Sequence, residues 1–281
     1  MTNIDHHDLT AWLGKQQEEE DVITARMADA FRATFDPHLW RGDGVWLGLH
    51  WCLFAPAEPM AALGRDGHPK TGGWLPPIPL PRRMWAGGRV EFLGDLQVGD
   101  RVRRETTIAG LDKKQGRTGP LYFLALDHVL STSRGIAIRE RQDIVYRDFD
   151  SGGASASNGV EAAVAEPVDV LWTIESSEPL LFRYSALMFN AHRIHYDLPY
   201  ATQVEGYPGL VVQGPLQATL ILNRCARDRG QRPSVFAYRG VSPLIAGPDF
   251  TVEIDAAEGE GVTCVTRNSQ RRICMKGQAC W

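Results

Sequence analysis

Residues 182–216 read FRYSALMFNAHRIHYDLPYATQVEGYPGLVVQGPL and gather polar side chains between two apolar segments. Asn190, His192 and His195 lie within six consecutive residues, and a loop punctuated by glycine and proline follows them. Gly214 then begins an apolar run with the pattern of a buried helix. A polar cluster next to a helix that begins with glycine indicates an active site.

The residue types in this stretch suit the addition of water to a double bond. A histidine, with an ordinary pKa of about 6.5, accepts a proton near neutral pH, and a neighbouring amide or carboxylate can orient a water molecule. A glycine at a helix start lets a backbone N–H approach a ligand oxygen, where the helix N-terminus favours developing negative charge. Together these groups fit hydration of a double bond conjugated with a carbonyl, or the reverse reaction.

Spacing alone leaves other interpretations open. A lone histidine is more often structural than catalytic, and two histidines three residues apart can also bind a metal ion. No third ligand is evident, since the nearness of Asp197 does not imply a triad, so we predict no metal site. Gly214 could equally serve close packing of its helix.

The composition is that of a soluble protein with a substantial core. The chain has 281 residues, 43% of them hydrophobic and 23% charged, which allows one large domain or two of ordinary size. The net charge of −4 gives no basic field for nucleic acid, and no segment is apolar for long enough to span a membrane. The acidic N-terminus lacks the pattern of a signal or transit peptide, so we expect a cytoplasmic protein.

The five cysteines predict reduced, buried thiols rather than disulfides or a zinc site. They lie at positions 52, 225, 264, 274 and 280, without CxxC spacing. Cys225 falls in the apolar helix, but no histidine near it in the sequence suggests a nucleophile. We therefore assign it no catalytic role.

The first half of the chain is expected to place a helix before a set of antiparallel strands. An apolar stripe at helical spacing predicts a helix over residues 11–36, and residues 44–54 suit a buried strand or a segment entering the core. Residues 55–81, with their dense proline run, must form an irregular loop. A regular element begins in 83–92, and residues 96–148 have the alternation of three long strands.

The second half repeats this order of elements. One or two short strands are expected over 168–187, a helix over 214–230 that ends at Gly230, and three strands in the remainder. At a shift of 148 residues, Leu96, Gly99 and Glu105 fall on Leu244, Gly247 and Glu253. The repetition predicts an internal duplication and an α+β fold made of two helix-plus-antiparallel-sheet units.

A small, polar, glycine-rich segment at residues 148–167 separates the two halves and has the composition of a linker. We therefore expect three parts, residues 1–150, 151–167 and 168–281.

The two halves together resemble the MaoC-like hot-dog dehydratases and hydratases. FRYSALMFNAHRIHYDLPYA and YPGLVVQGPLQATLI look like their signature, and GGWLPPIPLPRRMWAGGRVEF, VGDRV and GRTGPLYF look like the N-terminal unit of a two-domain branch. That branch contains mesaconyl-CoA and itaconyl-CoA hydratases and type 2 hydroxyacyl-thioester dehydratases. The resemblance implies a double hot-dog with a structural or substrate-binding N-terminal unit and a catalytic C-terminal unit.

The broader family carries S-G-D-x-N-P-x-H-x-D, and its alignment onto this chain assigns candidate catalytic residues. Its histidine falls on His195 and its final acid on Asp197, whereas its catalytic aspartate falls on Asn190. His192 and Arg193 replace its asparagine and proline. Because an amide can orient water but cannot exchange a proton, the departure at position 190 puts a two-base mechanism in doubt.

The segment before the apolar helix completes the expected mechanism. The family's V-x-H-G appears as VVQG, with Gln213 in place of histidine and Gly214 as the oxyanion donor. The Gly214 N–H is expected to polarise a thioester carbonyl while Asn190 and His195 hold a water. His195 takes the proton of that water and supplies one to the α-carbon, and His192 is the reserve acid–base group.

The resemblance also implies a substrate, a short branched dicarboxylic enoyl-CoA whose free carboxylate needs a cation. The substrate-binding candidates are four arginines, which match a carboxylate with their planar forks, and one glutamine: Arg82, Arg83, Arg183, Arg193 and Gln213. Coenzyme A enters as part of the substrate, and no other cofactor is expected. No glycine-rich phosphate loop is present in the sequence.

Three other functions remain open at the level of sequence: a 3-hydroxyacyl-carrier-protein dehydratase acting on uncharged chains, a hot-dog thioesterase, and a non-catalytic acyl-CoA-binding module. The polar cluster argues against the last, because binding of an apolar chain has no use for it. No nucleic-acid or membrane partner is expected. A homodimer is possible, although the duplication could supply the usual pairing of hot-dog units within one chain.

Overall fold

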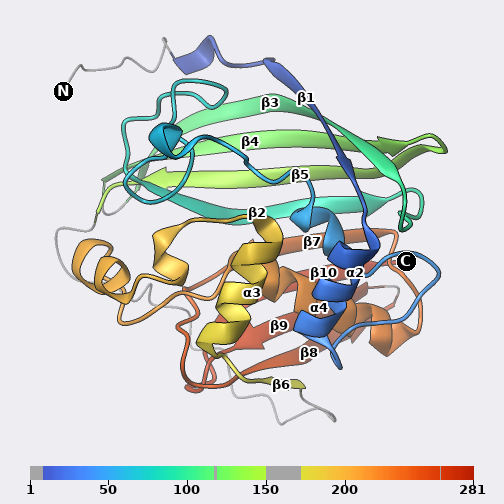
Figure 1. The fold of residues 1–281 in the computed structure, drawn as a ribbon. Coiled ribbons are helices and arrows are strands. Elements are labelled where there is room, and N and C mark those ends of the chain that lie inside the picture. Colours follow the sequence, from blue (N-terminus) through green and yellow to red (C-terminus); the bar gives the residue numbers. More distant parts are fainter. Residues whose placement is uncertain (1–8, 117–118, 150–171, 260) are drawn as a thin grey trace.

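The computed structural model describes residues 9–116, 119–149, 172–259 and 261–281, and it is built around one antiparallel sheet (Figure 1). The sheet has ten strands among these residues. Their order from edge to edge is β1 (Gln16–Val22), β3 (Arg101–Gly116), β4 (Gly119–Thr132), β5 (Gly135–Arg147), β2 (Arg82–Phe92), β7 (Val235–Gly240), β10 (Ile273–Cys280), β9 (Gly261–Arg267), β8 (Phe250–Glu258) and β6 (Trp172–Ile174).

The strands of the two halves form two contiguous blocks, which meet where β2 pairs with β7. Gly87 lies opposite Arg239 and Glu91 opposite Val235 at this junction. A Cβ atom on Gly88 would lie 2.3 Å from the carbonyl oxygen of Arg141, so only glycine fits there. The arrangement confirms the α+β double hot-dog. The expected linker 151–167 lies outside the described residues.

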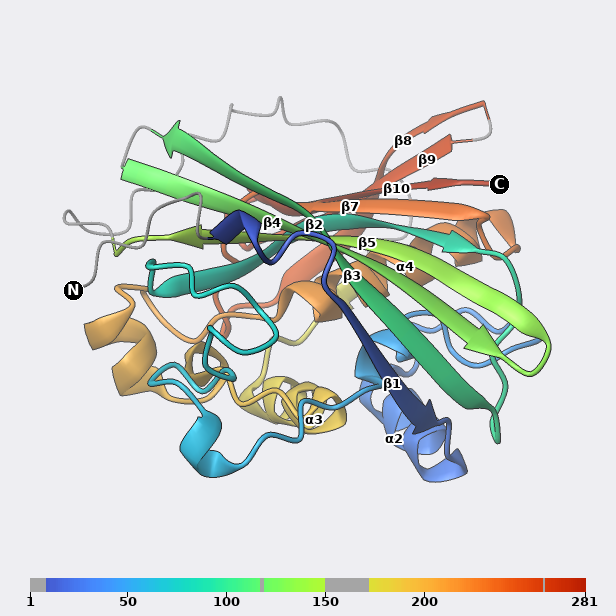
Figure 2. The ribbon, with the colours of Figure 1, turned by 90° about the horizontal axis from the view of Figure 1, so that it is seen from above.

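The helices gather on one face of the sheet, as the view from above shows (Figure 2). They are α2 (Ala25–Phe35), α3 (Glu178–Met188) and α4 (Gly214–Arg229). Short 3-10 or π turns add Leu49–Cys52, Met60–Ala62, Arg193–His195 and Tyr200–Val204. None of the helices in the described part of the chain is long and apolar enough to cross a membrane.

Helix α4 lies across β7, β8, β9 and β10 and is buried on almost all sides. Pro215 occupies its first turn, where a missing N–H costs nothing, and Gly230 ends it in the left-handed conformation with φ 67°. The fully buried Asn223 accepts a hydrogen bond from Trp40 N–H (3.0 Å) and donates one to Leu47 O (2.9 Å). These bonds join α4 to the first half of the chain. The bounds of α4 confirm the helix expected over 214–230.

The helix expected over residues 11–36 is wrong in its first part. Residues 16–22 form strand β1, and the helix begins only at Ala25, after Thr24 accepts a hydrogen bond from Met27 N–H (3.1 Å). The glutamates of β1 face arginines of β3, with Glu20 paired to Arg101 at 3.1 Å. These cross-strand ion pairs stabilise β1. The strand has no alternating apolar residues from which it could be predicted.

Two further predictions of secondary structure are wrong, and the structure decides between two alternatives for a third segment. Residues 178–188 form helix α3, whereas the sequence suggested only strands over 168–187, of which β6 is present. Residues 49–52 are a buried 3-10 turn, so the segment entering the core was the correct alternative for 44–54. Four strands rather than three follow α4, because the stretch before residue 260 contains both β7 and β8.

The cysteines are all free, and every one except Cys280 is buried, as expected.

Candidate active site

A cavity of about 3130 Å³ opens beside the junction of the two halves. Its volume exceeds the roughly 300–1,000 Å³ of an ordinary small-molecule pocket, so it includes a wide groove as well as a pocket. Both halves line it: His68, Arg83 and Trp85 come from the first, and Asn190, His192, His195 and Gly214 from the second. The expected catalytic residues therefore share one cavity.

His195 is held as a neutral base. It ends the 3-10 turn Arg193–His195 and is buried, with Nδ1 2.6 Å from the carbonyl oxygen of Val211. Because a carbonyl only accepts, Nδ1 must carry the proton, which leaves Nε2 as the acceptor. Burial lowers the pKa of His195 to about 4, so the ring is neutral at pH 7.

Asn190 comes just after α3, and within the described part of the chain the oxygen of its side-chain amide is hydrogen-bonded whereas the nitrogen is free. The helix ends at Phe189 in the left-handed conformation, and Asn190 N–H donates to Ser185 O (2.8 Å). The Asn190 Oδ1 accepts from His192 N–H (3.0 Å). Its Nδ2 has no acceptor among the described residues, so the amide can donate to a water oxygen in the cavity.

Gly214 is the first residue of α4, and the indole of Trp85 packs on it. A Cβ atom there would lie 2.7 Å from Cε3 of Trp85, so the close contact requires glycine. The N–H at the first position of a helix has no acceptor within that helix, so it is available to a ligand oxygen. The packing role is therefore present, and the oxyanion role stays a prediction compatible with it.

Gln213 is fully buried behind the cavity wall rather than in it. Its Nε2 donates to Leu181 O and to Ser185 Oγ, both at 2.9 Å. These bonds tie the start of α4 to α3 and give Gln213 a positioning geometry. Contact with a substrate has no support from its location.

The four candidate arginines differ in what they already bind. Arg82 pairs with Glu205 at 2.9 Å in a buried site, and Arg193 pairs with Asp197 at 2.6 Å. Arg183 is exposed outside the cavity and donates to Ala33 O (3.2 Å). Arg83 alone of the four lines the cavity without a hydrogen bond or ion pair to any described residue.

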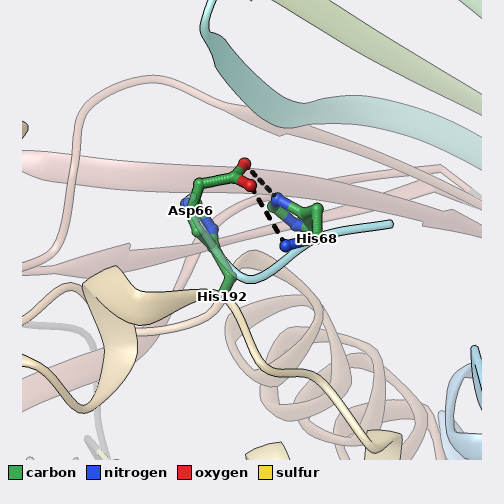
Figure 3. Close-up of side chains that lie close together, drawn as sticks. All are labelled: Asp66, His68 and His192. Carbon is green, nitrogen blue, oxygen red and sulfur yellow. Dashed lines mark hydrogen bonds and ion pairs between the residues drawn. The ribbon is translucent and has the colours of Figure 1, made fainter. Parts of the chain in front are cut away.

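His68 lines the cavity and Asp66 lies against it, although the sequence revealed neither residue (Figure 3). The Asp66 carboxylate lies 2.8 Å from His68 Nδ1 and also accepts from His68 N–H (3.1 Å). The ring centroids of His68 and His192 are 4.1 Å apart, and those of His192 and His195 5.3 Å. The only local signal is an Asp-Gly-His sequence inside the proline- and glycine-rich loop, and no spacing connects it with residues 190–195.

Gly67 lets this loop reach the second half of the chain. It has φ +92°, and a Cβ atom on it would lie 1.9 Å from Ala191 O. Beside it, Arg193 N–H donates to Asp66 O (2.9 Å). The loop is therefore fixed against the segment that carries the catalytic candidates.

Substituting Gly67→Ala is expected to displace Asp66 and His68 and to lower kcat by at least about tenfold. The reason is that a misplacement of reacting groups by roughly 1 Å can lower the rate of a reaction by about 10²-fold. Steady-state kinetics on an enoyl-CoA, with the melting temperature measured in parallel, checks this. Gly73→Ala in the same loop is the control, because a Cβ there meets nothing within 4 Å. Equal activity of the two variants would contradict the assigned role of the loop.

Comparisons with known proteins agree with the geometry. Residues 48–246 match the family described as hydroxyacyl-thioester dehydratase type 2. A mesaconyl-C(4)-CoA hydratase of Chloroflexus aurantiacus is 42% identical over 275 residues, covering 92% of this chain and 96% of that protein.

Solved structures share the fold at low sequence identity. A MaoC-like dehydratase superposes with a TM-score of 0.70 at 13% identity, covering 97% of this chain and 99% of the other. A Mycobacterium tuberculosis protein described as having a double hotdog fold reaches 0.56 at 13% identity, covering 95% and 96%. These likenesses support the fold, and the family match extends over most of the chain. The chain therefore belongs to the hydroxyacyl-thioester dehydratase type 2 family and is a hydro-lyase with a double hot-dog fold.

Proposed function

We propose that this chain adds water across the double bond of a short branched dicarboxylic enoyl-CoA, of the mesaconyl-CoA or itaconyl-CoA type. The observation that carries the proposal is the state of Arg83, a half-buried cation in the cavity that forms no hydrogen bond or ion pair with a described residue, although its charge acts on the Asp66 carboxylate. A positive charge that is partly removed from water favours an anionic ligand. A carboxylate at the acyl end of the substrate supplies that anion.

The position of Arg83 relates this cation to the catalytic candidates. Its charge lowers the pKa of both His68 and His192, which places the guanidinium near their rings. A carboxylate bound by its planar fork would hold a short acyl group beside the histidines. The 42% identical relative bears the name of a hydratase for such a substrate, which agrees with this interpretation.

The chemistry follows from the donors and acceptors in the cavity. The Gly214 N–H, at the positive end of α4, stabilises the negative charge that develops on the thioester oxygen. Asn190 Nδ2 donates to the attacking water, and His195 Nε2 accepts its proton as the oxygen bonds to the β-carbon. The α-carbon then takes up one proton to complete the hydration.

Substituting Arg83→Gln tests the substrate class. The variant should raise KM for mesaconyl- or itaconyl-CoA by about 10- to 100-fold, since a hydrogen bond to a charged group contributes roughly 1.5–3 kcal/mol. KM for crotonyl-CoA, which has no acyl carboxylate, should stay nearly unchanged. Initial rates with both substrates measure the difference.

Arg89→Gln is the matched control, because Arg89 lies on the same strand, is exposed and does not line the cavity. A wild-type preference for crotonyl-CoA would favour a dehydratase of uncharged acyl chains instead. Release of free coenzyme A would favour a thioesterase.

A further inference from the structure

The hydration requires two proton transfers. Among Asn190, His192 and His195, only His195 is suited to transfer a proton. Water loses a proton near the β-carbon, and the α-carbon gains one. Asn190 cannot exchange a proton. Burial, the largest cause, together with the neighbouring His68, His195, Arg83 and Arg82, lowers the pKa of His192 far below the usual range. The nearby Asp66 carboxylate is hydrogen-bonded to His68 and makes no hydrogen bond to His192 among the described residues. A second proton carrier must come from elsewhere in the cavity wall.

We propose that Asp66 and His68, contributed by the first half of the chain, form the second proton-transfer pair of this active site, with His68 as a catalytic residue and Asp66 as its positioning residue. The proposal rests on the hydratase function proposed above. It makes the active site a composite of the two hot-dog units.

The hydrogen bond to Asp66 determines how His68 can react. The carboxylate, 2.8 Å from Nδ1, holds the proton on that nitrogen and directs Nε2 away from the pair. Nε2 has no hydrogen bond to a described residue. The negative charge also stabilises the imidazolium form of His68, whereas His195 faces only a neutral carbonyl. His68 is therefore the better site for a proton that must be held and then delivered.

The loop places Asp66 next to the segment after Asn190, the position at which the family has an aspartate and this chain has an asparagine. Asp66 O accepts from Arg193 N–H, and Gly67 packs against Ala191, so the acid lies directly on the segment that follows Asn190. Asn190 Oδ1 is itself bonded within that segment, to His192 N–H. The structure thus supplies from a distant loop the carboxylate that position 190 does not provide.

The proton movements balance as follows. One O–H bond of water breaks, its proton goes to His195 Nε2, and the oxygen bonds to the β-carbon. The π electrons of the double bond move toward the thioester oxygen, and the α-carbon takes the proton from Nε2 of the His68 imidazolium. After product release, His195 loses its proton to solvent and His68 regains one. Dehydration reverses each step.

The charged and titratable groups around His68 set the expected pH dependence. Burial, the largest cause, and the charge of Arg83 lower the pKa of His68, and Asp66 offsets only part of this, so the net direction is downward. The ring of His192 faces His68 from the other half. Hydration needs His195 neutral and His68 protonated. Its kcat/KM should therefore rise with pH through the pKa of His195 and fall through that of His68.

The same three side chains could instead bind a cation, since the ligand atoms of Asp66, His68 and His192 lie within 4.8 Å of one another. The charges of Arg82 and Arg83, which already lower the pKa of His192, oppose a metal ion there. The proton-transfer role therefore fits the electrostatics better.

Two variants test the pair. His68→Gln should lower kcat for hydration by about 10²- to 10⁴-fold, the range of general acid–base catalysis, with little change in KM, and should remove the descending limb of the pH profile. Asp66→Asn keeps the shape but removes the charge. The pKa of His68 should then fall, and the descending limb should move to lower pH by about 1–3 units. A merely structural role would leave that limb in place.

His38→Gln is the control, because this histidine packs on Trp172 outside the cavity. Near-normal kcat of His68→Gln overturns the pair, as does an unmoved limb in Asp66→Asn, which decides the question if His68→Gln does not fold. Loss of wild-type activity in EDTA with recovery on adding Zn²⁺ overturns it in favour of a metal. Absence of any wild-type hydration is a failure of the proposed function, whereas wild-type hydration with an active His68→Gln variant is a failure of the pair alone.

Discussion

The His195→Ala variant is expected to hydrate enoyl-CoA with a kcat about 10²- to 10⁴-fold below that of the wild type, the usual contribution of a positioned acid–base group. The reason lies in the tautomer: the 2.6 Å contact with Val211 O leaves Nε2 as the acceptor, and a pKa of about 4 keeps it unprotonated at pH 7. Alanine removes this acceptor and leaves the oxyanion donor and Arg83 in place. KM should therefore change much less than kcat.

Stopped-flow or steady-state spectrophotometry of the enoyl-thioester measures this loss, and the melting temperature shows whether the fold is intact. His38→Ala is the matched control, since His38 is a partly buried histidine outside the cavity. A near-normal rate for His195→Ala, with the control unchanged, would remove His195 from the mechanism.

The second large effect is on stability, at the buried ion pair between Arg82 and Glu205. The two side chains are 8% and 4% exposed, with Arg82 Nε 2.9 Å from the carboxylate. Glu205→Ala leaves the guanidinium buried without its anion, which typically costs about 3–5 kcal/mol. The free energy of unfolding, measured by urea denaturation, should fall by that amount.

Glu20→Ala gives the comparison for this stability test. Glu20 pairs with Arg101 at 3.1 Å, but these side chains are 51% and 72% exposed, and such surface pairs contribute at most about 1 kcal/mol. Similar losses in the two variants would show that the Arg82–Glu205 pair does not stabilise the fold. Arg82 would then become available again as a ligand for the substrate.

Local sequence patterns predicted the parts of the fold that are stabilised locally. The long strands β3 to β5 show their alternation, and α4 has both its proline start and its glycine end within the chain segment itself. Strand β1 could not be found this way, because its glutamates depend on arginines of β3 for their partners. Helix α3 was missed because its apolar run has no period that distinguishes a buried helix from a strand.

The candidate site divides in the same way. Asn190, His192, His195 and Gly214 are close in the sequence, so one motif identified them all, and the cavity brings them together. The hydrogen-bonded Asp66–His68 pair comes from a loop in the other half, and only the fold shows that it lies against His192. No sequence pattern marks such a contact.

The choice among the four arginines was likewise beyond the sequence. Their side chains are chemically alike, and what separates them is the partner each one meets in three dimensions. Arg82 is paired with Glu205 and Arg193 with Asp197, and Arg183 lies outside the cavity. Of the four, Arg83 is therefore the one that lines the cavity without an ion pair to a described residue. A substrate proposal could therefore become specific only after these pairs were known.

The most direct test is the product formed by the purified wild-type chain from mesaconyl- or itaconyl-CoA. Mass spectrometry should find the intact thioester with one added water, formed with a higher kcat/KM than the hydrated product of crotonyl-CoA. Equal or better turnover of crotonyl-CoA would contradict the dicarboxylic substrate, and free coenzyme A without a hydrated thioester would contradict the hydratase function itself.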